Sequence, residues 1–166
     1  MKVKVIVIAL VLTGCAARYT QVYSGPELPK SDVAMIAGEL QGTKPWPEFR
    51  EWVVIRRVDG TEIDRVLGEW VTKVQVLPGQ RTLEVNTDYD GYGTLMQVTA
   101  ELFRSIPNQT LTLDAQAGHE YRIRFRRTTD RTVLPPTTGI VYWIEDAGTG
   151  EVISGAPPAS SQAPSP

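Results

Sequence analysis

The sequence predicts an all-β protein, with a single antiparallel β-sandwich as its folded domain. From Tyr121 to Arg126 every second residue is apolar, which is the pattern of a strand with one buried face. Turn dipeptides such as Asp59-Gly60 and Pro78-Gly79 separate short apolar runs. After the first 14 residues, no segment keeps a helical period over several turns. A small β-barrel is the alternative arrangement of these strands.

The first half of the domain contains apolar runs joined by turns. We expect a strand from Asp32 to Ala37, and a hairpin that joins Trp52–Val58 to Thr61–Arg65 through Asp59-Gly60. Pro78-Gly79 then turns the chain from the run 71–77 into the run 81–85, in which Leu83 and Val85 alternate with polar residues.

The second half continues in the same way. The run 95–103 is an expected strand, and Leu111, Leu113 and Ala115 face inward on the next one. After the turn at Ala117-Gly118 comes the strand with Tyr121, Ile123 and Phe125 on its inner face. The last two strands are 140–144 and 151–154, connected through Thr149-Gly150.

The N-terminus has the order of a secretory signal. Lys2 and Lys4 precede the apolar run Val5–Leu12, and small residues lead to Cys15, the only cysteine. The run is too short to span a bilayer, which takes roughly 20 apolar residues. Leu12-Thr13-Gly14-Cys15 resembles the lipobox of bacterial lipoproteins. A non-lipidated signal or a hydrophobic N-terminal strand is the alternative.

The resemblance implies cleavage before Cys15 and acylation of both its sulfur and the new N-terminus. Several acyl chains hold a protein durably at a membrane, whereas one holds it only weakly. Ala16-Ala17 lacks the acidic residue that often retains such proteins in the inner membrane, which favours the outer membrane. The expected organisation is a cleaved signal at 1–14, the lipidated cysteine and a tether at 15–30, the domain at 31–154, and a disordered Pro/Ser/Ala tail at 155–166.

The charge balance argues against a nucleic-acid partner. The chain has 17 basic and 19 acidic residues, and loss of Lys2 and Lys4 with the signal leaves 15 against 19, a net charge of −4. With Cys15 acylated, no disulfide is available to the domain. Its stability must therefore come from packing.

The turn and core residues resemble those of small uncharacterised bacterial lipoproteins and, more loosely, PEGA-type surface modules. The shared motifs are Val58-Asp59-Gly60, Leu77-Pro78-Gly79, Ala117-Gly118-His119-Glu120-Tyr121 and Trp143-Ile144-Glu145-Asp146. They cover most of residues 31–154 and imply a β-sandwich. They carry no catalytic signature, so the resemblance implies a fold and no reaction.

The chain offers little catalytic or metal chemistry. His119 is the only histidine, so a histidine-pair metal site is excluded. We expect it to hydrogen-bond a turn, at 59–60 or 78–79. A general base would need a nucleophile, and no Gly-x-Ser-x-Gly elbow is present. Glu145-Asp146 is expected to open a loop, since neighbouring strand side chains point to opposite faces.

The segment 88–93, Asp-Tyr-Asp-Gly-Tyr-Gly, superficially resembles a calcium loop. Tyr92 and Thr99 stand where the loop needs oxygen ligands, so a hairpin tip is the favoured interpretation. The four tryptophans, at 46, 52, 70 and 143, are expected in the core or capping the sheets. No cofactor or metal is expected.

Arg122, Arg124 and Arg126 form a row on one strand face, about 7 Å apart, with Arg127 beside them. One interpretation is a solvated face paired with acidic residues of neighbouring strands. The other is a contact with anionic groups: lipid headgroups, lipopolysaccharide phosphates or an acidic partner.

The expected function is that of a non-enzymatic envelope lipoprotein, anchored through Cys15, that displays a binding or assembly surface in the periplasm. Sheet edges and the arginine row are the candidate contacts with an envelope protein or anionic lipid. A carrier of a small apolar or envelope-derived ligand between the sheets is the alternative. A hydrolase is the third alternative and ranks last, because the sequence lacks the arrangement of nucleophile and base that a hydrolase needs.

Overall fold

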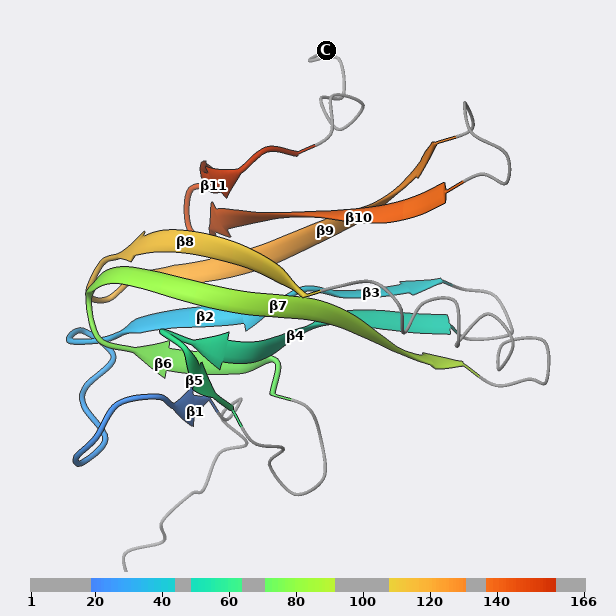
Figure 1. Ribbon diagram of the computed structural model, residues 1–166. Coiled ribbons are helices and arrows are strands. Elements are labelled where there is room, and N and C mark those ends of the chain that lie inside the picture. Colours follow the sequence, from blue (N-terminus) through green and yellow to red (C-terminus); the bar gives the residue numbers. More distant parts are fainter. Residues whose placement is uncertain (1–18, 44–48, 64–70, 92–107, 131–136, 158–166) are drawn as a thin grey trace, which may run out of the picture.

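The computed structural model describes residues 19–43, 49–63, 71–91, 108–130 and 137–157 (Figure 1). Over these residues the protein is all-β, with strands arranged in two curled sheets and no helix. The predicted fold class is therefore confirmed at this level.

The first sheet has the order β1-β6-β2-β9-β10-β11. Its strands are β1 (Thr20–Gln21), β2 (Ala34–Gly38), β6 (Lys73–Val76), β9 (Glu120–Asp130), β10 (Thr137–Asp146) and β11 (Val152–Gly155). The second has the order β3-β4-β7-β8, with β5 paired to β4. Its strands are β3 (Leu40–Thr43), β4 (Phe49–Val58), β5 (Thr61–Glu62), β7 (Gly79–Gly91) and β8 (Gln109–Ala115).

The first sheet is mixed, which corrects the expectation of a wholly antiparallel fold. β1 pairs with β6 in parallel, and β2 pairs with β9 in parallel. Parallel neighbours need a long connection, and the whole second sheet lies between β2 and β9 along the chain. Turn dipeptides identify only hairpins between consecutive strands, so they could not reveal these pairs.

The sheet also begins earlier than expected. Residues 15–30 were predicted to be a tether, but Thr20 and Gln21 form β1 opposite Val74 and Gln75. The Val22 N–H then donates to the Gln75 carbonyl at 3.0 Å, and the Val22 side chain packs against the core. A two-residue strand gives no periodic signal, which is why the sequence pattern missed it. At the other end β11 closes at Gly155, one residue past the predicted boundary.

The predicted strands that fall within the described residues are present; β4, β7, β8, β9 and β10 are longer than expected, whereas β2 and β6 are shorter. Asp59 and Gly60 have φ values of 51° and 78°, as a type I′ hairpin turn between β4 and β5 requires. The expected strand at 95–103 and the end of the one at 61–65 lie outside the described residues.

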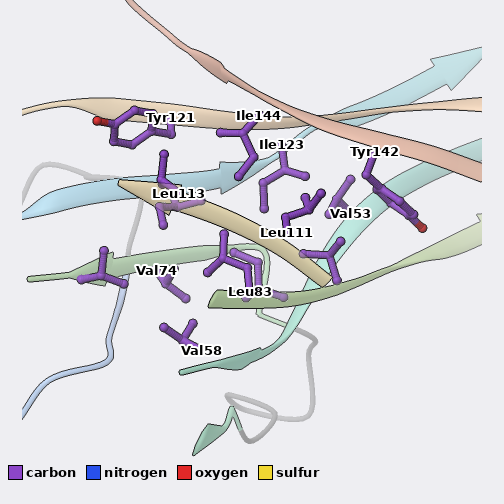
Figure 2. Packing of buried hydrophobic residues seen from close by; sticks show 14 of the residues in the cluster. Val53, Val58, Val74, Leu83, Leu111, Leu113, Tyr121, Ile123, Tyr142 and Ile144 are labelled. Carbon is purple, nitrogen blue, oxygen red and sulfur yellow. The ribbon is translucent and has the colours of Figure 1, made fainter. Parts of the chain in front are cut away.

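One cluster of buried residues joins the two sheets (Figure 2). Leu83 and Val85 from β7 meet Tyr121, Ile123 and Phe125 from β9, and all five are at most 3% exposed. Tyr121 and Tyr142 lie at opposite ends of the cluster. The predicted inner face of β9 is therefore confirmed.

The chain crosses from the first sheet to the second at Gly38 and Glu39, between β2 and β3. The Gly38 N–H donates to the Thr72 carbonyl, and the Glu39 N–H donates to the Ile123 carbonyl. The Glu39 carbonyl in turn accepts from the Val53 N–H at 3.0 Å. A Cβ atom on Gly38 would lie 2.4 Å from the Val53 carbonyl oxygen. Only glycine lets the two sheets approach this closely.

Gly38→Ala is therefore expected to lower the free energy of unfolding by about 2–3 kcal/mol, because backbone must move to admit the methyl group. Gly60→Ala is the control: its φ is positive but nothing lies within 4 Å of the added atom, so about 1 kcal/mol is expected. Urea unfolding of the purified proteins measures both. Equal losses would show that the corner tolerates a side chain.

Candidate functional site

The arginine row lies on the outer face of the first sheet, as predicted. Because Tyr121, Ile123 and Phe125 point into the core, alternate residues of β9 point the other way. Arg122 is exposed, and Arg124 and Arg126 are partly buried. The structure thus brings all three onto one face but gives them different surroundings.

Arg124 is held by carboxylates on both sides. Its Nε donates to Glu145 at 2.8 Å and its Nη1 donates to Glu39. The Trp143 indole donates to the other oxygen of Glu145 at 2.7 Å. Burial raises the pKa of Glu145, but the hydrogen bonds from Trp143 and Arg124 outweigh it, and the net pKa is lowered.

The same chain of hydrogen bonds continues into the second sheet. Gln41 on β3 donates to Glu39 at 3.1 Å and to the Phe125 carbonyl at 3.0 Å. One network of hydrogen bonds therefore connects β10, β9 and β3 across the outer face, and its members are Trp143, Glu145, Arg124, Glu39 and Gln41. For Arg124, the interpretation as a residue paired with neighbouring acids is the correct one.

Arg127, next to the row, points into the space between the sheets. Its Nε donates to Glu51 at 3.0 Å and its Nη2 donates to the other carboxylate oxygen at 2.5 Å. Glu51 is only 5% exposed. A bidentate, largely buried pair of this kind fixes the positions of β4 and β9 relative to each other.

Arg122 differs from the others, since the described residues contain no ion pair or hydrogen bond to its side chain. Glu145 stands opposite it on β10, but the Glu145 oxygens are bonded to Trp143 and Arg124. Arg122 lines a groove of about 590 Å³, together with Tyr19, Ala37, Lys73 and Trp52. Tyr19 and Lys73 were not candidates from the sequence, because their approach depends on β1 and β6 lying in this sheet.

His119 bonds to Asp146, whereas a turn at 59–60 or 78–79 was expected. The His119 Nδ1 lies 2.8 Å from Asp146 Oδ2, and Asp146 Oδ1 accepts from the N–H groups of Gly148 and Thr149, each at 2.9 Å. Asp146 thereby ties the turn after β10 to the turn before β9. Glu145 and Asp146 have separate partners, as the loop-entry interpretation requires.

The stability of this turn should depend on acid pH. The hydrogen bond from His119, with those from Thr149 and Gly148, lowers the pKa of Asp146 to about 2, against about 3.9 when unfolded. The contribution is therefore complete above pH 4 and is lost as the pH falls towards 2. We expect Asp146→Asn to be less stable than the wild type at pH 7, with the difference shrinking between pH 4 and 2.

Urea unfolding at pH 7, 4 and 2.5 measures this, and Asp114→Asn, an exposed carboxylate on β8, is the matched control. A wild-type advantage over Asp146→Asn that stays constant down to pH 2.5 would contradict the assignment.

The acidic segment at 88–93 is not a loop over residues 88–91. These residues belong to β7 and pair with β4, with Asp88 opposite Trp52 and Asp90 opposite Arg50. Both the calcium-loop and the hairpin-tip interpretations are wrong there, and Tyr92 and Gly93 lie outside the described residues. Within the described ranges, no group of three His, Cys, Asp or Glu residues could hold a metal ion.

The tryptophans divide in two. Trp143 is 7% exposed on the outer face and Trp52 is partly buried beside the groove. Trp46 and Trp70 lie outside the described residues, as does Cys15.

In the described part of the chain, no helix is long and apolar enough to cross a membrane. Comparisons with protein-family models, curated proteins and solved structures found no match.

The different surroundings of the arginines predict different effects of replacement. Arg124→Gln leaves Glu39 and Glu145 without their cation and should lower the free energy of unfolding by about 2 kcal/mol. Arg122→Gln removes no bond within the described chain and should change it by less than about 0.5 kcal/mol. Thermal and urea unfolding measure both variants. Equal losses would show that Arg122 is also part of the structural network.

Proposed function

We propose that this protein is a bacterial envelope lipoprotein, anchored in the outer membrane through acylated Cys15, that displays a non-enzymatic binding or assembly surface in the periplasm. The observation that carries the proposal is the tetrapeptide Leu12-Thr13-Gly14-Cys15 at the end of a short apolar run. The outer face of the first sheet, with Arg122, Arg124 and Arg126, is its candidate contact face.

The finer fold in this proposal is a β-sandwich. Two sheets that share one core support it. The Tyr121 hydroxyl accepts a hydrogen bond from the Gln116 N–H at 3.1 Å, and a tyrosine bonded to backbone a few residues upstream is common in immunoglobulin-like sandwiches. β4 also donates hydrogen bonds to Glu39, just after β2, and to Val71, just before β6, and these bonds keep the small barrel as an alternative.

Packing supports a display module over a ligand carrier. A carrier needs an apolar cavity of a few hundred Å³ between its sheets. The five side chains from β7 and β9 that would line it are instead packed in one cluster. The grooves that contain the arginine row have charged side chains in their lining, among them Glu39, Arg124 and Arg126, and are not apolar cavities.

The anchor is tested by Cys15→Ser. Without the sulfur that is acylated, the variant should incorporate no labelled palmitate and should be absent from the carbonate-washed membrane fraction. Ala16→Ser, which keeps Cys15, is the matched control and should behave as wild type. Membrane retention of Cys15→Ser after the wash would overturn the proposed anchor.

A further inference from the structure

Two cations flank a small residue on the floor of the groove. Ala37 on β2 stands opposite Lys73 on β6 on one side and opposite Arg122 on β9 on the other. Adjacent strands are 4.7–4.9 Å apart, so the backbones that carry the two cations are about 10 Å apart. With only a methyl group between them, Lys73 and Arg122 can close on one anion from both sides.

Of the two carboxylates that line the groove, Glu39 is paired with a cation, whereas Glu120 accepts, among the described residues, only a neutral hydroxyl. Glu39 is bonded to Arg124 and Gln41, and Glu120 accepts from the Tyr19 hydroxyl at 3.2 Å. Burial and then Glu120 raise the pKa of Tyr19, so Tyr19 stays a neutral hydrogen-bond donor.

Lys73 and Arg122 have no ion pair within the described residues. The Lys73 Nζ lies 5.8 Å from the centre of the Tyr19 ring, at the outer limit of a cation–π contact. Of the three cations that line the groove, only Arg124 is held by carboxylates. The groove is thus lined by three cations, Lys73, Arg122 and Arg124, against two carboxylates, Glu39 and Glu120, which leaves one net positive charge.

The groove is also close to the proposed anchor. Tyr19 lines it and follows Cys15 by four residues, which can span at most about 14 Å. Trp52 and Leu40, which is 63% exposed, line the same groove. Such side chains suit the boundary between headgroups and acyl chains.

We infer that Lys73 and Arg122 bind the phosphate of an anionic lipid headgroup in the membrane that holds the anchor, so that the outer face of the first sheet is turned towards that membrane. The inference rests on the proposed anchoring at Cys15. The Arg122 guanidinium can bond two phosphate oxygens in its plane, and the Lys73 ammonium adds a point charge from the opposite side.

The test is titration of the lipidated protein, in micelles of a neutral detergent, with short-chain phosphatidylglycerol, followed by tryptophan fluorescence or calorimetry. Lys73→Gln and Arg122→Gln should each raise the dissociation constant about fivefold, the effect of one cation near anionic lipid. Arg126→Gln, on the same face of the same strand but outside this groove, is the matched control and should match wild type within twofold.

Three results would overturn the inference: no binding, equal binding of phosphatidylcholine, or equally tight binding of inorganic phosphate, which would make the ligand a free anion. Each cation is replaced singly, and circular dichroism shows whether each variant is folded. If one variant is unfolded, the other still tests the inference. Palmitate labelling in the same preparation separates the two proposals. If the protein incorporates palmitate but does not bind phosphatidylglycerol, only the headgroup site is overturned. If it incorporates no palmitate, the anchor is overturned.

Discussion

The structure depends on the corner at Gly38 and Glu39, where the chain leaves one sheet for the other. Glu39 contacts both sheets through three groups: its N–H to Ile123, its carbonyl to Val53, and its carboxylate to Arg124 and Gln41. Gly38 allows this approach because any side chain would meet the Val53 backbone. The shape of the groove follows, since Ala37 and Leu40 line it from either side of the corner.

The sequence predicted what depends on local pattern. Alternation identified the buried face of β9, and Asp59-Gly60 identified a hairpin turn, because each signal lies within a few residues. The acidic segment was misjudged for the same reason. Its Asp, Tyr and Gly composition is typical of a turn, but pairing with β4 extends β7 to Gly91.

The candidate site depends on register between distant strands, which the sequence does not carry. Lys73 and Arg122 flank Ala37 only because β2 lies between β6 and β9, and one of these pairings is parallel. His119 reaches Asp146 because Tyr121 and Asp146 are opposite each other in the β9–β10 pair. Neither grouping could be chosen from spacing, since spacing along the chain does not show which strands are neighbours.

The arginines of β9 illustrate the same limit in electrostatic terms. Arg124 connects sheets through two carboxylates, Arg127 is paired inside with Glu51, and Arg122 has neither kind of partner in the described chain. Replacing all three residues of the row together would therefore mix a structural loss with a functional one. Arg122, in contrast to Arg124, can be removed without breaking the network that holds the corner.

The pairing of β1 with β6 shortens the connection between the proposed anchor at Cys15 and the folded domain. A flexible tether of the 15 residues first expected would give a root-mean-square span of roughly 20 Å and leave the domain free to rotate. With β1 in the sheet, only the residues between Cys15 and Tyr19 remain. A short connection turns headgroup binding into an intramolecular event at millimolar effective concentration. In a protein anchored as proposed, a site of two cations, weak in free solution, would then be sufficient to orient the domain on the membrane.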